Sequence, residues 1–396
     1  MAQENVFPIS FWCQPTNTYE NWKTVAECGF TVAPITATSV EEGRKVLDWL
    51  QEFGIKGMIV DPRITVTLPD ARGWKETIQQ IVADYQDHPA LWGYYINDEP
   101  GLDRFANLGK LVKTFQKADP VHVAYINLFP NYASPDQLGT ISYQRHVEAY
   151  VDTVKPLLLS YDHYALLENG DRPEYFPNLE VIRAEALRVG IPFMNIFLST
   201  PHFNYRDPSA LDLRWEVYTS LAYGAKAIAY FTYLTPDVEN YRNGPISIYE
   251  KVTPKYDMIR QLNLEVRNLA PWLLALTSTG IYHIGTVPAG CEGLCGCGLV
   301  AEADGSGHDL LVGEFVDGDK NPWVMVMNKD RQHAAWVTLK LRSPLKKLHE
   351  VARSTGQMRA IARDQGVDAF KTYEDGLVVS FWLAPADARL IRVSAE

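Results

Sequence analysis

The chain has no run of basic residues and no apolar stretch of the length that crosses a membrane. Its 37 Lys and Arg are outnumbered by 48 Asp and Glu, which gives a net charge of −11 at pH 7. A surface of this sign disfavours nucleic acid and anionic membranes as partners. The missing segment of about 20 apolar residues argues against a transmembrane helix. We therefore expect no nucleic-acid partner and no membrane partner, and the sequence leaves the oligomeric state open.

Cysteine is scarce, and the usual start of a secreted precursor is missing. Five cysteines in 396 residues is an odd number and predicts no disulfide framework. Cys291, Cys295 and Cys297 fall in a glycine-rich stretch, for which we expect a hairpin in preference to a metal site. Met1–Asn5 lacks the basic start and the apolar run of a signal peptide. A chain whose leader had been removed would look the same, so localisation stays open: secreted or periplasmic in that case, otherwise cytoplasmic.

Motifs for common cofactors are absent as well. The sequence has no glycine-rich phosphate loop and no dinucleotide fingerprint, so no cofactor is expected. The H-x-H pair of many barrel metalloenzymes is also missing, and we expect no metal. A metal site built from His163 and His202 with Asp61 or Asp162 remains an alternative.

What the sequence does contain is a regular alternation of short apolar runs and amphipathic segments. Eight strand–helix units occupy the first ~270 residues, the normal size of a (β/α)8 barrel, and the alternation favours a parallel sheet. We predict an α/β fold with a TIM barrel over residues 1–272. The candidate strands are Val6–Trp12, Phe30–Ile35, Ile55–Val60, Leu91–Ile96, Val121–Leu128, Leu157–Tyr161, Phe193–Leu198 and Ala225–Tyr230.

The pattern changes after Lys255–Leu269, the last predicted barrel helix. Short strand candidates separated by Gly, Asp and Asn turns replace the helical periods. They are Tyr282–Ile284, Leu310–Phe315, Trp323–Asn328, Ala335–Leu341, Leu348–Val351 and Val378–Leu383. We predict a smaller accessory domain over residues 273–396, an antiparallel β-sandwich.

One strand candidate, Leu91–Ile96, ends in two acids. Apolar and aromatic residues carry a strand into a core, whereas Asp and Glu are seldom buried without a reason. Asp98 and Glu99 should therefore reach the carboxyl-end edge of the barrel, where active sites of this fold lie. Capping of the next helix would ask for one acid and not for two. We interpret Glu99 as a catalytic acid.

Residues that follow the other strands should lie at the same edge. The predicted substrate-binding residues are Trp12, Asp61, Arg63, Asn97, Asn127, His163, Tyr164, His202 and Tyr233. Acids on several strand ends among amides and aromatic rings are more typical of a carbohydrate site than of a phosphate site, since flat rings can stack on sugars. For Trp12, Tyr164 and Tyr233 the alternative is packing in the core.

The segment His88–Tyr94, followed by Asn97–Pro100, resembles the fourth-strand segment of clan A glycoside hydrolases. In those barrels a similar lead-in ends in Asn-Glu-Pro, and that Glu is the acid/base. The resemblance therefore implies the same role for Glu99, on what is also the fourth predicted strand here.

The resemblance extends along the chain. Leu262–Leu269 resembles the terminal barrel helix of β-galactosidase-type enzymes, and Val324–Asp330 and Leu383–Arg389 resemble their accessory β-sandwich. Two features depart from clan A. Asp98 stands where that clan has Asn, and the seventh strand and its end, Phe193–Thr200, contain no acid where that clan has its nucleophile.

The adjacent Asp98 and Glu99 also resemble the pair of substrate-assisted hexosaminidases, in which Asp orients a 2-acetamido group and Glu protonates the leaving oxygen. Ser160-Tyr161-Asp162 resembles the Tyr-Asp of chitinase barrels. These likenesses imply that an N-acetylhexosamine is a plausible substrate.

Glycosidic cleavage needs a proton donor and a second carboxyl group, or the substrate itself, at the oxocarbenium-like centre. Aromatic surroundings and the neighbouring Asp98 should both raise the pKa of Glu99 toward neutrality. The second group is Asp162, Asp98 or Asp61. We prefer Asp162, because strand six lies two places round the ring from strand four.

The sequence thus predicts a glycoside hydrolase that acts on an oligosaccharide or glycoside. Two other classes remain open. One is a non-catalytic carbohydrate-binding barrel, which the acid-free seventh strand favours, and the other is a lyase or metal-dependent isomerase on the same fold.

Overall fold

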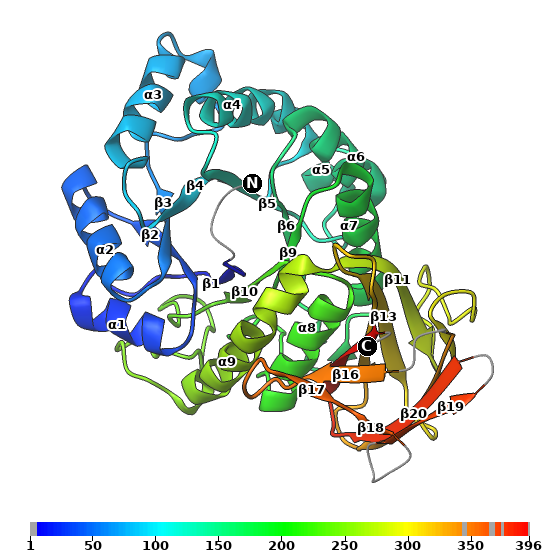
Figure 1. Cartoon of the computed structure of the whole chain (residues 1–396). Helices are drawn as coiled ribbons and strands as arrows, with labels where there is room; N and C mark the ends of the chain where they lie inside the picture. The colour runs from blue at the N-terminus through cyan, green and yellow to red at the C-terminus, as the bar shows by residue number, and fades with distance from the viewer. Residues whose placement is uncertain (1–5, 343–346, 364–368, 374–375, 395–396) are drawn as a thin grey trace. The chain divides into compact units, whose positions relative to one another are not determined.

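The computed structural model of the chain describes residues 6–342, 347–363, 369–373 and 376–394. The signal-peptide expectation rests on Met1–Asn5, which lies outside these residues. The chain divides into two compact units, which interleave in sequence (Figure 1). One comprises Met1–Asp207 and Lys226–Asn263, and the other comprises Pro208–Ala225 and Leu264–Glu396. The predicted domain boundary at residue 272 stays a prediction.

The first unit contains a parallel eight-stranded sheet in the order β1-β10-β9-β6-β5-β4-β3-β2. The Thr31 N–H donates to the Ile9 carbonyl oxygen (3.0 Å), so β1 also meets the start of β2 and the ring closes. This is the predicted TIM barrel. Its strands are β1 Ile9–Phe11, β2 Val32–Thr36, β3 Lys56–Val60, β4 Leu91–Asp98, β5 Val123–Leu128, β6 Leu159–Asp162, β9 Phe193–Leu198 and β10 Ala227–Phe231.

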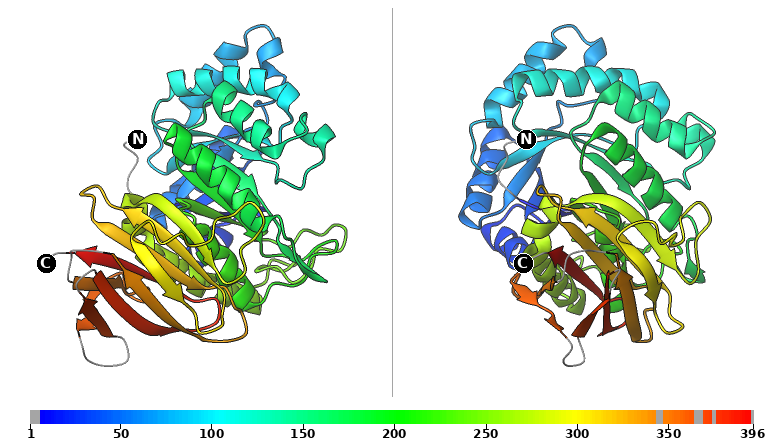
Figure 2. Two further views of the ribbon diagram at one scale, coloured as in Figure 1. Left: turned by 90° about the vertical axis from the view of Figure 1, so that its right-hand side faces the viewer. Right: turned by 45° about the vertical axis from the view of Figure 1, so that its right-hand side comes forward.

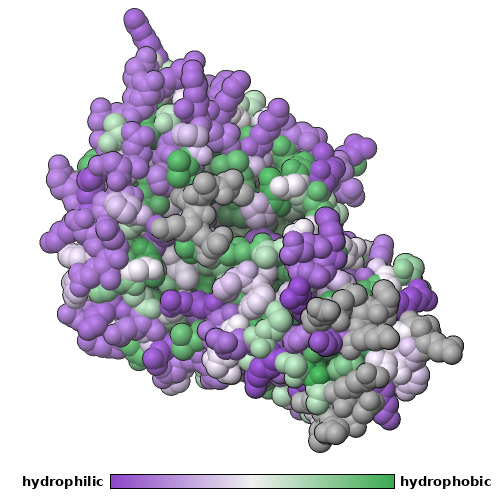
Figure 3. All heavy atoms as spheres, viewed as in Figure 1, coloured by the Kyte–Doolittle hydropathy of each residue, from purple (hydrophilic) through white to green (hydrophobic). Residues whose placement is uncertain are grey.

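Helices of this unit surround the sheet (Figures 1 and 2). They are α1 Tyr19–Glu27, α2 Val40–Glu52, α3 Trp74–Tyr85, α4 Phe105–Ala118, α6 Tyr143–Val154 and α7 Tyr175–Val189, with the shorter elements η1 Leu68–Asp70, η2 Leu102–Arg104, α5 Pro135–Leu138, β7 Leu166–Leu167 and β8 Gly170–Asp171. In Figure 3 hydrophilic residues cover most of the outer faces of α1–α4. Among the described residues, no helix has the length and apolar character needed to cross a bilayer.

Helix α2 illustrates why these segments of the sequence form helices. The Ser39 side chain accepts a hydrogen bond from the Glu42 N–H (3.2 Å) and caps the first turn. Val46, Leu47 and Leu50 then recur at helical spacing and are fully buried.

Side chains fill the barrel interior, so it is a packed core below the strand ends. The buried cluster comprises Val32, Met58, Trp92, Val123, Tyr125, Leu158, Met194, Ile196, Ala227 and Ala229. Large rings on β4 and β5 and small residues on β10 belong to this one cluster. The polar residues discussed below lie at the carboxyl ends of these same strands.

The second unit contains the predicted β-sandwich. One sheet has the order β11-β13-β14-β21-β16-β17 and the other β12-β15-β20-β19-β18. Pairing is antiparallel except between β18 and β19. The strands are β11 Thr277–Ile284, β12 Val300–Asp304, β13 Leu310–Val316, β14 Pro322–Asn328, β15 Ala335–Leu341, β16 Lys347–Val351, β17 Met358–Ala360, β18 Ala362–Arg363, β19 Ala369–Tyr373, β20 Gly376–Leu383 and β21 Ala388–Ser394.

Two helices carry residues of the second unit, α8 Ala210–Ala222 and α9 Pro254–Ala275. We had predicted that the last helix ends at Leu269, before Pro271, but α9 continues through the proline. Proline removes one helical hydrogen bond at a cost of about 3 kcal/mol. Burial of Leu269 and Leu273, each under 4% exposed, offsets that cost.

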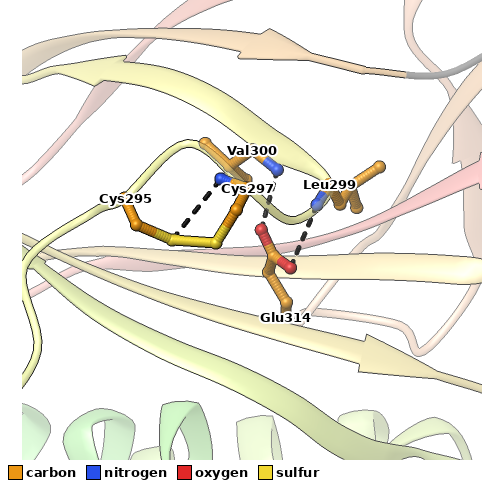
Figure 4. The surroundings of a disulfide bond; sticks show 5 residues. All are labelled: Cys295, Cys297, Leu299, Val300 and Glu314. Atoms are coloured by element: carbon orange, nitrogen blue, oxygen red, sulfur yellow. Dashed lines mark hydrogen bonds between the residues drawn. A yellow bond between two sulfur atoms is a disulfide. The ribbon is translucent and has the colours of Figure 1, made fainter.

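Cys295 and Cys297 form a disulfide in the loop between β11 and β12 (Figure 4). The odd cysteine count gave no sign of this bond, which joins residues only two positions apart with Cα atoms 5.4 Å apart. The loop is fixed beside it by Glu314, whose carboxylate accepts hydrogen bonds from the N–H groups of Leu299 (3.1 Å) and Val300 (2.7 Å).

Gly93 allows β4 to approach β5. A methyl group at this position would clash with the backbone carbonyl oxygen of Val123, which cannot move without disturbing the sheet. We predict that Gly93→Ala lowers the free energy of unfolding by about 1–3 kcal/mol, the usual cost of overpacking. Urea denaturation measures this. Gly318→Ala, where nothing lies within 4 Å of the added carbon, is the control and should be neutral.

Candidate functional site

The end of β4 is irregular, and this irregularity positions the acids. The pairing of β4 with β5 contains a bulge between Tyr95 and Asn97, after which Asp98 pairs in register with Asn127. A bulge changes the direction in which the following side chains point. The sequence predicted a strand with acids at its end, but the bulge has no signature in the sequence.

Glu99 follows with a positive φ of 43°, in the left-handed region that non-glycine residues rarely occupy. Its N–H donates to the Asn127 carbonyl oxygen (2.9 Å), which continues the β4–β5 ladder by one residue. A conformation of this kind costs of order 1–3 kcal/mol and persists where the surrounding structure imposes it. Residues in such conformations concentrate at functional sites, so the backbone conformation of Glu99 supports a functional role for this residue.

Asn127 connects the acids. Its side-chain amide group donates to Asp98 Oδ1 (3.1 Å) and to Asp162 Oδ1 (2.9 Å), which uses both of its hydrogens. Its own Oδ1 accepts a hydrogen bond from Ser160 Oγ (3.2 Å), which is also 2.9 Å from the Tyr125 hydroxyl. The network fixes the orientation of the amide, and one buried side chain thereby holds carboxyl groups from β4 and β6.

The carboxyl groups of Glu99 and Asp162 lie close enough for each to shift the pKa of the other. Burial, followed by repulsion from Asp98, raises the pKa of Glu99 to about 7. Burial also raises the pKa of Asp162, whose side chain is almost completely enclosed, and Glu99 and Asp98 add to the rise. Two carboxyl groups in contact cannot both ionise freely, so the pair retains a proton near neutral pH.

Asp98 completes what we call the carboxyl cluster: Asp98, Glu99 and Asp162. Asp98 keeps an accessible surface, although protein atoms surround it closely enough to raise its pKa to about 6 by desolvation. The carboxyl cluster is therefore accessible from outside through Asp98 and half-buried Glu99, with Asp162 behind them.

Aromatic rings lie next to the carboxyl cluster. Burial raises the pKa values of Tyr95 and Tyr164. The negative charges of Asp98 and Glu99 add to the rise for Tyr95, and all three acids add to it for Tyr164. Trp12 meets Tyr95 edge-on, with ring centroids 5.9 Å apart. Of the predicted stacking residues, the structure thus brings Trp12 and Tyr164 to this region, both of them half-buried.

Several residues of this region were not predicted. Tyr125 and Ser160 lie two positions before Asn127 and Asp162 on their strands, so the two-residue period of a strand could have identified them. Tyr132 lies in the loop after β5, and Asp162 contributes to its raised pKa. No pattern in the sequence indicates this position.

Asp61 and Arg63 are not brought to the carboxyl cluster. The Arg63 guanidinium donates to both carboxylate oxygens of Asp61 (2.9 and 2.6 Å) and to Asp84 of α3 (2.7 Å). This pairing binds the loop after β3 to a helix on the outside of the barrel. Asp61 is thus occupied by a cation and is a poor candidate for the second catalytic carboxylate.

Three other predicted residues are buried among aromatic rings. His163 is fully enclosed and packs edge-on against Tyr132 and Tyr175; burial lowers its pKa to about 3, so it is neutral. His202 stacks on Tyr241 with centroids 4.5 Å apart. Tyr233 is 1% exposed and lies against Phe11 and Phe30, which leaves its ring no free face for a sugar. These three side chains are enclosed because they pack in the core, which is the alternative that the sequence analysis gives for Tyr233.

The last two sequence predictions concern Asn97 and the alternative metal site. Asn97 is half-buried, and its Oδ1 is a buried atom without a hydrogen-bond partner among the described residues. Within the described part of the chain, His163, His202, Asp61 and Asp162 do not converge into a group with metal-ligand spacing. The metal-dependent alternative therefore lacks the ligand set that it requires.

Solved structures show the same architecture. A glycoside hydrolase family 5 protein from Bacteroides vulgatus superposes with a TM-score of 0.61 at 12% identity, over 98% of this chain and 90% of that one. A protein described as a glycoside hydrolase gives 0.59 at 13% identity, over 98% and 93%. A β-galactosidase from a psychrophilic Marinomonas gives 0.52 at 10% identity, over 68% of this chain and 62% of that one.

No profile of a protein family and no curated protein matches the sequence. At these identities the structural likeness defines the fold, a (β/α)8 barrel followed by an antiparallel β-sandwich. The predicted resemblance to barrel glycoside hydrolases is confirmed at that level.

The carboxyl cluster should cost stability at high pH. Asp98 has a folded-state pKa above its ordinary value, so its contribution to stability is largest at low pH and is lost as pH rises toward about 6. We predict that Asp98→Asn raises Tm by about 2–4 °C at pH 8 and has little effect at pH 4.5. Calorimetry at both pH values measures this. The exposed Asp319→Asn is the control for the change in net charge, and equal shifts in both variants at pH 8 would refute the account.

Proposed function

We propose that the protein is a glycoside hydrolase in which Glu99 is the general acid/base and Asp162 is its partner. The observation that carries this proposal is the pair of carboxyl groups at the carboxyl ends of β4 and β6, each of which shifts the pKa of the other. Glycosidic cleavage uses two carboxyl groups in this way. The names of the structurally similar proteins support the same chemistry, although a fold by itself does not define a function.

Glu99 has the properties required of the proton donor. Its pKa of about 7 leaves about half of the Glu99 carboxyl groups protonated at pH 7, and the group is acidic enough to transfer the proton, which is the condition for efficient general acid catalysis. Asp98 supports this role through its negative charge, which opposes ionisation of Glu99. The Asn127 amide holds Asp98 and Asp162 in place, so it acts as a positioning residue.

Asp162 is the preferred partner on geometric grounds. Inverting enzymes keep their two carboxyl groups about 6.5–9.5 Å apart to admit a water molecule between them, whereas retaining enzymes keep them nearer 5 Å. Glu99 and Asp162 each shift the pKa of the other, which favours the shorter separation of retaining enzymes. In the proposed reaction Asp162 therefore acts on the anomeric centre directly, or orients a substrate group that does so, and the product keeps its configuration.

Carbohydrate binding draws on the residues around the carboxyl cluster. The half-buried rings of Trp12 and Tyr164 present apolar surfaces to a sugar. These features also fit the second candidate, a carbohydrate-binding protein without activity. The raised pKa of Glu99 favours the enzyme, because binding a sugar does not require a carboxyl group that holds a proton at pH 7.

The general acid assignment predicts the behaviour of Glu99→Gln. Because glutamine cannot donate the proton, we expect turnover to fall by about 10²-fold or more while sugar binding is retained. A panel of chromogenic glycosides that includes N-acetylhexosaminides measures the rates. Glu76→Gln, an exposed change on α3, should leave them unaffected. If the parent protein binds a sugar without hydrolysing any of the panel, the binding-protein candidate replaces the enzyme.

The contact between Glu99 and Asp162 predicts the stereochemistry of the reaction. We expect the first product released to have the anomeric configuration of the substrate. Proton NMR during early turnover distinguishes the two anomers before they equilibrate. Release of the inverted sugar would show that Asp162 does not act with retention at the anomeric centre, even if Glu99 is the acid.

A further inference from the structure

A second group of convergent side chains lies in the β-sandwich, in two loops that the glycosidase proposal does not use. His308 Nδ1 is 3.0 Å from Asp330 Oδ2, and His333 Nδ1 is 3.1 Å from the same oxygen. The three candidate ligand atoms all lie within 4.8 Å of one another. Two imidazole nitrogens thus meet one carboxylate oxygen.

We propose that His308, Asp330 and His333 form a binding site for a divalent transition-metal ion of the zinc class. Two His and one carboxylate, with a water molecule in the fourth position, are an established ligand set for zinc. At metal–ligand distances near 2.1 Å, tetrahedral coordination places neighbouring ligand atoms about 3.4 Å apart. The His–Asp separations are already close to that value, so small side-chain rotations open the space for an ion.

The surroundings of Asp330 orient it for this role. Its Oδ1 accepts hydrogen bonds from the N–H groups of Gln332 (2.7 Å) and His333 (3.0 Å), which leaves Oδ2 to the two histidines. Hydrogen bonds of this kind fix a ligating carboxylate and are part of most metal sites. The histidine side chains are 28% and 65% exposed, so an ion and its water ligand can enter.

The two cationic residues next to Asp330 in the sequence, Lys329 and Arg331, contact other groups. Arg331 pairs with Asp212 (3.0 Å) and lies over the Trp215 ring. Lys329 donates to the carbonyl oxygen of Thr286 (3.0 Å) and is 3.2 Å from His283 Nδ1. Neither is placed to neutralise Asp330, which therefore keeps its charge for a metal ion.

The position of the site suggests its effect. His308 precedes β13 in the connection from β12, and Asp330 and His333 lie in the connection from β14 to β15. Each connection crosses from one sheet of the sandwich to the other. An ion held by both would link the two crossings at one end of the sandwich and stabilise it, since binding to the folded state alone raises stability.

Isothermal titration of the tag-free, chelator-treated protein with ZnCl2 tests the proposal. We expect about one ion per chain with a dissociation constant near 1 μM or below, and a Tm that rises by about 5 °C or more at a hundredfold excess over that constant. His308→Ala and His333→Ala should each weaken binding at least tenfold, and the double variant should abolish it. His349→Ala, on β16 of the same unit, should bind as the parent does.

Two results would overturn the site: no saturable zinc binding up to about 100 μM, or undiminished binding by the double variant. Circular dichroism of the metal-free variants checks that they fold, and His308→Gln with His333→Gln replaces the alanine pair if they do not. The visible spectrum of the Co²⁺-loaded parent provides an independent readout, because d–d bands typical of tetrahedral coordination are expected and their absence from a loaded parent would count against the site.

Discussion

The proposed active site depends on the crowding of three carboxyl groups at one edge of the barrel, where Asp162 is buried and Glu99 is half-buried. Asp98, Glu99 and Asp162 come from two strands, and the Asn127 side chain fixes two of them at hydrogen-bond distance. Desolvation and mutual repulsion then keep a proton on the cluster at a pH where isolated carboxyl groups have lost theirs. The barrel supplies the rigidity that makes this arrangement persist, because each acid lies at the end of a paired strand.

The same arrangement explains why the site requires an irregular backbone. A regular β4 would continue its alternation and would not place Asp98 opposite Asn127 and Glu99 over Asp162. The bulge after Tyr95 and the positive φ of Glu99 supply the change of direction, at a cost that the hydrogen bond from Glu99 N–H to Asn127 partly offsets. The backbone conformation of Glu99 and the repulsion among the carboxyl groups therefore both lower the stability of the fold, as is common at sites where proteins carry out chemistry.

Much of the architecture could be predicted from the sequence. The alternation of apolar runs and amphipathic segments gave the barrel, and the loss of helical periods gave the sandwich, because both depend on local patterns of burial. Asp98, Glu99, Asn127 and Asp162 were predicted to lie at one edge because parallel strands end together.

The sequence could not show which partner each side chain contacts. Asp61 and Tyr233 also follow strands, yet one pairs with Arg63 and the other enters the core. β12 and β21 were missed because outward-facing charges, such as those of Glu302 and Arg392, interrupt their apolar pattern.

The titration of the Glu99 carboxyl group tests the central claim most directly, since it needs no substrate. Carbon-13 NMR of the side-chain carboxyl carbon, assigned with Glu99→Gln, reports its protonation as pH is varied. The account predicts a midpoint of about 7, and a lower midpoint in Asp98→Asn because the repelling charge is gone. A midpoint near the ordinary glutamate value of about 4.3 in the parent would contradict the account.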